Sequence, residues 1–342
     1  MPFLIVSGIS KEGDGKFVVR NINFTQRKFQ KIVIAGETGS GKSTLLKIIA
    51  GLVQPDAGEV RLENKRIEGP DEKLVAGHSN IAYLSQYFEL PQFLRVEQIL
   101  TYSNRLTDDS ARTLYDVCNI GHLINRDTNQ LSGGERQRIA LALLLSASPK
   151  LLLLDEPFST LDIIHRDILK SVIHNISKRL KISCILVSHD PADVLSWADE
   201  ILILKEGQIL QQGSPEKIYR QPANTYVAGL FGSYNLLSPA QSNAFSALLG
   251  LKANKKRLFV RPENFKLVSE GSPGLKGKVK RVYFLGGYQE VEVSISRKSI
   301  ILKTEPNEIQ PGDTVYVSLS PKDMGYVKKN IKGRTNISHD QN

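Results

Sequence analysis

A glycine-rich loop is the first segment whose residue types and spacing predict chemistry. Residues 36–43 read GETGSGKS and fit the phosphate-binding pattern GxxxxGK[ST], between an apolar strand-like run and a helical segment. Glycines let backbone N–H groups converge on phosphate oxygens, and a helix N-terminus adds partial positive charge. Lys42 would reach the β- and γ-phosphates, and the Ser43 hydroxyl would bind Mg²⁺. The predicted nucleotide contacts of this phosphate loop and the residue after it are Gly36, Glu37, Thr38, Gly39, Ser40, Gly41, Lys42, Ser43 and Thr44.

Two carboxylates follow an apolar run of leucines, residues 151–154. Such a run is typical of a strand covered on both faces, and open α/β sheets bind ligands beyond the carboxyl ends of their strands. Asp155 would hold Mg²⁺ there, directly or through water. Glu156 would orient the attacking water or accept its proton. Together with the phosphate loop, this pair predicts hydrolysis of a nucleoside triphosphate.

A capped helix is predicted by residues 131–138, which read LSGGERQR. Ser132 and Glu135 have the spacing of a capping box that opens the following helix. Gly133 and Gly134 leave the backbone bare at that helix N-terminus, which predicts a second anion site. An ordinary helix cap is the alternative that the spacing alone leaves open.

The same residues, 131–138, resemble the signature sequence of ATP-binding cassette (ABC) ATPases, which other phosphate-loop NTPases lack. The other motifs of that family follow in its order, so the resemblance covers residues 3–230. It implies that Gln86 is the Q-loop glutamine, which senses Mg²⁺ and contacts a membrane partner. It also implies that Asp162 is the D-loop aspartate and that His189 is the switch histidine on the γ-phosphate. The roles implied by this resemblance are, for catalysis, Glu156, His189 and Gln86; for nucleotide contact, Ser132, Gly133, Gly134 and Asp162; and for the metal, Ser43, Gln86 and Asp155.

The segment that would cover adenine departs from the family pattern. The family usually stacks an aromatic ring, commonly that of a Tyr, on adenine early in the chain. Residues 10–17 read SKEGDGKF, so Phe17 is the nearest substitute. A stacking role and a place in the core are both open for this ring. The D-loop also differs, because Thr160 stands where the family commonly has a small residue.

Charge and composition divide the chain near residue 235. The chain has 342 residues, and residues 235–342 hold 18 of its 45 Lys/Arg and 9 of its 35 Asp/Glu, which is +9 of the formal +10. At about 100–200 residues per domain, this length predicts two domains. Before the boundary, apolar runs alternate with helical segments, which predicts an α/β cassette over residues 1–230 with a helical lobe at about 87–135. After it, short alternating strands and turns predict an all-β, OB-like barrel over residues 235–330.

Two segments resemble the C-terminal part of some importer ATPases. Residues 257–263 read RLFVRPE and resemble the entry of a TOBE domain, the small OB-like barrel of those subunits. Residues 221–232 are similar to the linker that precedes it. The resemblance therefore implies an importer of the type that takes up polyamine, iron, sulfate or sugar, and the linker and tail favour polyamine.

The predicted function is that of an ATP-hydrolysing subunit that energises solute import through separate permease subunits, by ATP-driven closure of a cassette dimer. ATP and Mg²⁺ are the expected cofactors. The expected partners are transmembrane permease subunits, a second copy of this chain and, indirectly, a solute-binding protein. Two alternatives stay open, an exporter's ATPase subunit and a soluble ABC ATPase that acts on nucleic acid or ribosomes. Nucleic-acid binding is not favoured, because no array of aromatics interleaved with bases stands out in the basic third.

Several classes of protein are excluded by the sequence. The longest apolar-rich stretch, residues 139–154, is interrupted by Pro149 and Lys150, whereas a bilayer span needs about 20 apolar residues. The N-terminus lacks the basic region of a secretory signal. Cys118 and Cys184 have neither metal-site nor disulfide-framework spacing. The reducing cytoplasm is therefore the default location, and the resemblance to importer ATPases implies a peripheral position at the cytoplasmic face of the inner (cell) membrane.

Overall fold

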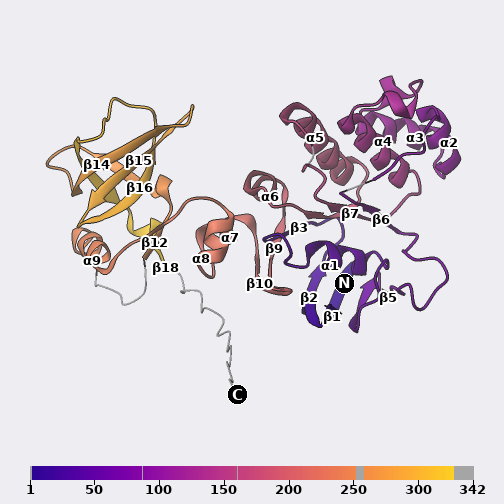
Figure 1. The fold of residues 1–342 in the computed structure, drawn as a ribbon, viewed down its shortest axis with the longest axis horizontal. Coiled ribbons are helices and arrows are strands. Elements are labelled where there is room, and N and C mark those ends of the chain that lie inside the picture. The colour runs from indigo at the N-terminus through magenta and orange to yellow at the C-terminus, as the bar shows by residue number, and fades with distance from the viewer. Residues whose placement is uncertain (1, 87, 160, 252–257, 327–342) are drawn as a thin grey trace, which may run out of the picture. The chain divides into compact units, whose positions relative to one another are not determined.

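The computed structural model describes residues 2–86, 88–159, 161–251 and 258–326. The chain divides into two compact units, Met1–Pro215 and Glu216–Asn342. In Figure 1 the N-terminal unit combines strands and helices, whereas strands dominate the C-terminal unit.

A six-stranded, mainly parallel sheet lies at the centre of the N-terminal unit (Figure 1). Its strands, in spatial order, are β10 (Gln208–Gly213), β9 (Glu200–Lys205), β3 (Lys31–Ala35), β8 (Ser183–Val187), β7 (Leu151–Asp155) and β6 (Ile81–Leu84). All neighbouring pairs are parallel except β9 and β10. Every residue of β7 and β8 is buried, as expected for strands covered on both faces. The predicted α/β sheet is thereby confirmed.

A second, antiparallel sheet was not predicted from the sequence. Its strands, in spatial order, are β2 (Lys16–Gln26), β1 (Leu4–Gly13), β4 (Ala57–Leu62) and β5 (Lys65–Arg66). Helix α1 (Lys42–Ile49), which follows the phosphate loop, shares one apolar core with both sheets. Ile9 and Ile22 come from the antiparallel sheet, Leu45 from α1, and Ile34 and Leu153 from the main sheet. The antiparallel sheet therefore fixes the helix whose N-terminus would bind phosphate.

Three helices form the lobe beside β6: α2 (Val96–Ser103), α3 (Asp108–Cys118) and α4 (Gly133–Leu145). Two further helices, α5 (Ile163–Arg179) and α6 (Pro191–Trp197), follow β7 and β8. Within the described ranges, no helix combines the length and the apolar content that a bilayer span demands.

The C-terminal unit is built from two antiparallel sheets. The larger has the order β13 (Phe265–Val268), β17 (Thr314–Leu319), β14 (Leu275–Phe284), β15 (Gln289–Ile295) and β16 (Lys298–Thr304). The smaller has the order β11 (Asn235–Leu236), β12 (Leu258–Val260) and β18 (Gly325–Tyr326). Val291, Val293 and Ile295 are buried and the residues between them are half-buried, which matches the predicted period of two.

Helix α9 (Pro239–Leu248) was missed by the sequence prediction, because its polar residues look like part of a linker, and the strands β11, β13 and β18 were missed as well. Ser238 and Gln241 form a capping box, and Pro239 stands in the first turn, where its missing N–H costs nothing. Phe245 is fully buried, and its ring centroid lies 5.7 Å from that of Phe265. Packing of this one ring on the sheet stabilises a helix that propensity alone does not predict.

Arg261 holds the linker helices α7 (Pro215–Arg220) and α8 (Thr225–Leu230) to the C-terminal unit. Its side chain is 2% exposed, and burial lowers the pKa of its guanidinium group. The guanidinium N–H groups donate to four backbone carbonyls at 3.0–3.2 Å, those of Tyr219, Ala228, Gly232 and Ser233. The side chain of Arg261, in the RPE segment (residues 261–263), therefore supplies hydrogen-bond donors to backbone carbonyls at the ends of both helices.

Replacing Arg261 by Met is expected to lower the free energy of unfolding of the C-terminal unit by about 3 kcal/mol or more, because each buried carbonyl left without a donor costs about 1–3 kcal/mol. Chemical denaturation followed by circular dichroism measures this change. Arg297→Met, at an exposed arginine of the same unit, is the matched control and should change little. Equal stability of the Arg261 variant and the control would contradict the role given to these hydrogen bonds.

Candidate functional site

The phosphate loop runs from the end of β3 into α1 and is held against β2. Gly41 is the N-cap of α1 and has φ 96°, a conformation that favours glycine. A Cβ atom at this position would lie 2.4 Å from the carbonyl oxygen of Val18, so no side chain fits. Glycine is therefore required where the loop enters the helix, and the first N–H groups of the helix, which have no intrahelical acceptor, could bind an anion there.

Lys42 is buried, with 6% of its surface exposed, and its ammonium group folds back onto the loop. Nζ donates to the carbonyl oxygens of Gly36 at 2.9 Å and Glu37 at 2.8 Å. Burial lowers the pKa of Lys42, and the nearby carboxylates of Glu156 and Asp155 oppose that shift. The loop thus holds the Lys42 ammonium group in place. When a nucleotide binds, its phosphate oxygens would replace the two carbonyl oxygens as the acceptors of that group.

Asp155 stands at the end of β7, directly beside the start of α1. Its carboxylate is 4% exposed and accepts hydrogen bonds from Ser43 Oγ at 2.9 Å and from the Tyr83 hydroxyl at 3.0 Å. Burial, followed by the charge of Asp155, raises the pKa of Tyr83. Tyr83 was not predicted as a site residue, because only the pairing of β6 with β7 places it next to Asp155.

The Ser43 and Asp155 oxygens fit Mg²⁺, which prefers oxygen ligands and is usually bound by one or two carboxylates together with substrate phosphates. In the described part of the chain, no group of three or more His, Cys, Asp or Glu residues could hold a metal ion by itself. The donor set therefore matches an ion that is completed by phosphate oxygens.

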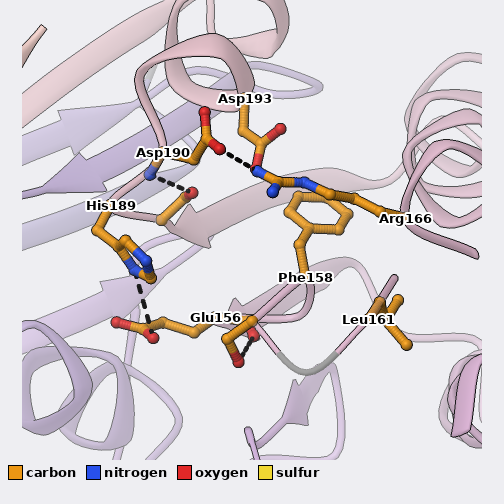
Figure 2. Close-up of a pocket in the computed structure, with 9 residues that line it drawn as sticks. Glu156, Phe158, Leu161, Arg166, His189, Asp190 and Asp193 are labelled. Atoms are coloured by element: carbon orange, nitrogen blue, oxygen red, sulfur yellow. Dashed lines mark hydrogen bonds and ion pairs between the residues drawn. The ribbon is translucent and has the colours of Figure 1, made fainter. Parts of the chain in front are cut away.

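Glu156 and His189 both line a cavity of about 110 Å³ and contact each other there (Figure 2). Glu156 Oε2 lies 3.5 Å from His189 Nδ1, and the two side chains are 21% and 64% exposed. The backbone of Glu156 has φ 47°, which turns its carboxylate away from the direction of the strand. A carboxylate and an imidazole at this separation can together hold a water molecule or a phosphate oxygen.

Gln86 follows β6, and its amide Nε2 donates to Ser159 Oγ at 3.3 Å. Ser159 Oγ in turn donates to the carbonyl oxygen of Glu156 at 3.0 Å. The segment after β6 is thus connected to the turn that carries the candidate base. Thr160, the departure noted in the D-loop, lies outside the described residues.

Arg166 fixes the segment that follows His189, and this contact was missed by the sequence prediction. Its guanidinium group donates to Asp190 and, at 2.5 Å, to Asp193 Oδ2 (Figure 2). The Asp193 side chain is 1% exposed and also pairs with Lys170 Nζ at 2.6 Å. An Arg on one helix and an Asp before the next carry no sequence signal of pairing, because the contact exists only in the folded chain.

The signature segment, residues 131–138, begins α4 as predicted. Ser132 Oγ accepts from the Glu135 N–H at 3.3 Å, and the Ser132 N–H donates to Glu135 Oε2 at 2.8 Å, which confirms the capping box. Gly133 is exposed and Gly134 is buried. These residues lie in the helical lobe, whereas Lys42, Ser43, Asp155, Glu156 and His189 gather at the carboxyl edge of the main sheet.

Phe17 lies near the start of β2 with 46% of its surface exposed, so the structure does not place it in the core. The Arg20 guanidinium carbon lies 5.3 Å from its ring centroid. The backbone of the next residue, Val18, lies against Gly41, so this part of β2 runs beside the phosphate loop. An exposed aromatic ring in this place is suited to stacking on a base.

Replacing Phe17 by Ala is expected to weaken ATP binding by about 1–3 kcal/mol, the range for a base stacked on an aromatic side chain. The rate at saturating ATP should stay nearly unchanged, because stacking stabilises ground state and transition state equally. Binding titrations and steady-state kinetics measure the two effects. Phe29→Ala removes a ring that is similarly exposed, at 43%, and serves as the control. Unchanged nucleotide affinity in the Phe17 variant would leave adenine to another group.

Comparisons with known families match two segments of the chain. The model described as ABC transporter matches residues 19–159, and the model of the TOBE domain matches residues 258–325. The first match includes the phosphate loop, the signature segment and Asp155. The second includes the RPE segment and most of the C-terminal sheets.

Curated relatives match over nearly the whole chain. The sulfate/thiosulfate import ATP-binding protein CysA of Synechocystis sp. is 32% identical over 335 residues, which cover 93% of each chain. The glucose import ATP-binding protein GlcV of Saccharolobus solfataricus is 31% identical, covering 96% of this chain and 99% of the relative. The spermidine/putrescine import ATP-binding protein PotA of Clostridium acetobutylicum is 29% identical, covering 95% and 96%.

Solved structures match the cassette. CbiO1 from Clostridium perfringens, described as part of the ABC transporter complex cbiONQ, has a TM-score of 0.55 and 26% identity, and covers 64% of this chain and 90% of its own. The ATP-binding cassette MJ0796, bound to ADP and Pi in a dimeric structure, has a TM-score of 0.52 and 24% identity. The match covers 62% of this chain and 98% of the MJ0796 chain, and it shows the shared fold. The predicted cassette fold and C-terminal TOBE region are confirmed. The phosphate loop, the paired Ser43–Asp155 site and the capped signature helix all occur in this one chain. This protein belongs to the ATP-binding subunits of ABC importers, which energise solute uptake and here carry a C-terminal TOBE domain.

Proposed function

We propose that this subunit hydrolyses MgATP at the carboxyl edge of its main sheet, and that it does so in a dimer of two cassettes. The observation that carries the proposal is the cluster in which Ser43 and Asp155 share a hydrogen bond beside Lys42 and Glu156. Mg²⁺ bound there would neutralise charge on the β- and γ-phosphate oxygens.

Each side chain of the site has a distinct role in the proposed reaction. Ser43 Oγ and Asp155 would hold the metal ion, with Gln86 reaching it from the segment after β6. Lys42 would exchange its two carbonyl acceptors for oxygens of the β- and γ-phosphates. Glu156 would take the proton from the attacking water, and His189 would contact the γ-phosphate.

The second copy of the chain would complete the site. In the head-to-tail arrangement that we propose, Ser132, Gly133 and Gly134 of one cassette close on the γ-phosphate held by the other. ADP lacks that phosphate, so ATP favours the closed dimer and hydrolysis releases it. Asp162 would lie in the same interface.

Two exposed isoleucines support this dimer. Ile163 and Ile164 follow Asp162 directly and are 79% and 73% exposed. Covering each side chain with a partner would contribute about 1.5–3 kcal/mol. A second cassette that meets Asp162 would cover at least part of this apolar pair.

The energy of dimer closure would be passed to separate permease subunits at the cytoplasmic face of the membrane. Phe93 and Tyr102, which are 81% and 79% exposed, are apolar side chains of the helical lobe close in sequence to Gln86 and are suited to such a contact. A solute-binding protein would deliver the solute to the permease. We propose the division into a nucleotide-binding part, residues 1–230, and a regulatory TOBE part, residues 235–330. The boundary between the two compact units lies earlier in the chain, between Pro215 and Glu216.

Polyamine is the solute that we propose, from the linker and tail of the chain. The relatives are named for sulfate, polyamine, iron and glucose import, so an uptake experiment has to compare these four classes. Uptake of labelled spermidine, sulfate, Fe³⁺ and glucose, in cells with and without this gene, measures the solute directly. Loss of spermidine uptake alone is the expected result, and loss of another uptake activity would replace polyamine as the solute.

Co-purification from detergent-solubilised membranes tests the transporter assignment. We expect the tagged chain to retain permease subunits, and we expect less of them with Phe93→Ser/Tyr102→Ser than with the wild type. A tagged chain that retains ribosomes or DNA and no membrane protein would contradict the proposal.

A further inference from the structure

His165 lies in the first turn of α5, where its ring touches two segments that are far apart in the sequence. Its Nδ1 lies 2.7 Å from Asp162 Oδ2, and its backbone N–H donates to Asp162 Oδ1 at 3.0 Å. Both oxygens of the Asp162 carboxylate are therefore held by the same residue. With the ring proton on Nδ1, the side-chain contact is a hydrogen bond from the imidazole to a charged acceptor.

The opposite side of the imidazole packs on the signature segment. A Cβ atom at Gly134 would lie 2.8–3.0 Å from His165 Cδ2, Cβ and Cγ, closer than real Cβ contacts. Gly134 is buried, so the bare backbone of the turn before α4 rests on the ring. The ring is thus a spacer of fixed thickness between the N-terminus of α4 and the carboxylate that caps α5.

We propose that His165 is a positioning residue that sets the separation of the Gly134 turn and the Asp162 carboxylate, so that one cassette presents both to its partner together. This inference rests on the proposed dimer, in which both segments meet the second copy. The imidazole does not contact nucleotide in this scheme and acts only through its two neighbours. Removing the ring would free Asp162 Oδ2 and open a gap beside Gly134. The arrangement in which one cassette presents both segments to its partner would then be populated less often, and hydrolysis would slow.

Steady-state ATP hydrolysis by the full chain tests the hydrogen bond. His165→Leu keeps bulk beside Gly134 but cannot donate to Asp162, whereas Asn places an amide N–H close to the position of Nδ1. We expect Leu to lower kcat by about 3- to 10-fold, the factor for one exposed hydrogen bond, with KM for ATP within about twofold. His165→Asn should retain most of the rate. His174→Leu, at an exposed histidine of the same helix, is the matched control and should match the wild type.

Three outcomes would overturn the inference: full activity of His165→Leu, an equal loss in the Asn and Leu variants, or a loss confined to KM. Dimer formation with ATP, measured on the same samples, separates this inference from the proposed function. A wild-type chain that shows no ATP-driven dimer contradicts the proposed function and with it the inference. If the wild-type chain dimerises with ATP and the His165→Leu variant hydrolyses ATP at the wild-type rate, the inference is contradicted and the proposed function is not.

Thermal unfolding of a double-mutant cycle tests the steric contact. Gly134→Ala should lower the melting temperature when His165 is present, and should lower it less in a His165→Ala background, where the new methyl group has room. Equal losses in the two backgrounds would show that the ring does not determine the need for glycine, and would overturn its role as a spacer.

Discussion

Glu156→Gln lowers the kcat for ATP hydrolysis by about 10²–10⁴-fold in our account, the range for losing a general base, while the affinity for ATP stays unchanged. The physical reason is that an amide cannot accept the proton of the attacking water, although it fills the same space beside His189. The site keeps its shape because the backbone of Glu156 is held independently of its carboxylate: its N–H donates to the Val187 carbonyl at 3.1 Å, and its carbonyl accepts from Ser159 Oγ at 3.0 Å.

Steady-state kinetics and ATP titration of the Glu156→Gln variant measure the two effects separately. Glu206→Gln is the matched control, since that carboxylate is 84% exposed and pairs only loosely with Lys205, at 3.9 Å. We expect the control to keep the wild-type rate. A Glu156→Gln variant that keeps more than a tenth of the wild-type rate would assign the proton transfer to another group.

Lys42→Ala is expected to weaken ATP binding by about 100-fold or more, because hydrogen bonds to charged groups contribute about 1.5–3 kcal/mol each and Lys42 would make two. The fold should survive, because alanine removes both the two hydrogen bonds to the Gly36 and Glu37 carbonyls and the cost of burying the ammonium group, and these changes oppose each other. The lowered pKa of Lys42 reflects that burial cost. The melting temperature without nucleotide should therefore stay near that of the wild type, whereas the rise caused by ATP should disappear.

Lys47→Ala provides the control for this variant on the same helix, because Lys47 is exposed in the last turn of α1. It should bind ATP as the wild type does. Normal ATP affinity in the Lys42→Ala variant would mean that the loop backbone alone binds the phosphates. A large fall in the melting temperature without nucleotide would instead give Lys42 a structural role.

Local patterns in the sequence predicted much of the site. The phosphate loop, the leucine run before Asp155 and the capping box at Ser132 each lie within about ten residues, so spacing alone identifies them. The roles of Gln86, Asp162 and His189 came from the family resemblance and stay proposals. Whether Phe17 stacks on adenine was open, and its exposure favours that role.

Contacts between distant residues could not be predicted in this way. Tyr83 reaches Asp155 only because β6 pairs with β7, and Arg166 reaches Asp190 only because α5 packs beside α6. The pairing of β1 with β4 was missed for the same reason, since β4 lies about 45–60 residues further along the chain. The β1–β2 hairpin, by contrast, has a local signal that the sequence prediction did not use, the Asp14–Gly15 turn with positive φ at both residues. A period or a motif reports local structure, and these pairings are decided by tertiary packing.

The state of association of the Glu156→Gln variant tests the central claim most directly. Light scattering or sedimentation would give its mass with ATP, with ADP and without nucleotide, alongside Glu156→Gln/Ser132→Asp. Asp is as good a helix N-cap as Ser, so α4 should stay intact while the added charge repels the γ-phosphate. We predict that the Glu156→Gln variant is a dimer with ATP but not with ADP or without nucleotide. We predict that the double variant does not dimerise with ATP. A mass that ATP does not change, or a dimer that Ser132→Asp leaves intact, would contradict closure of two cassettes over ATP.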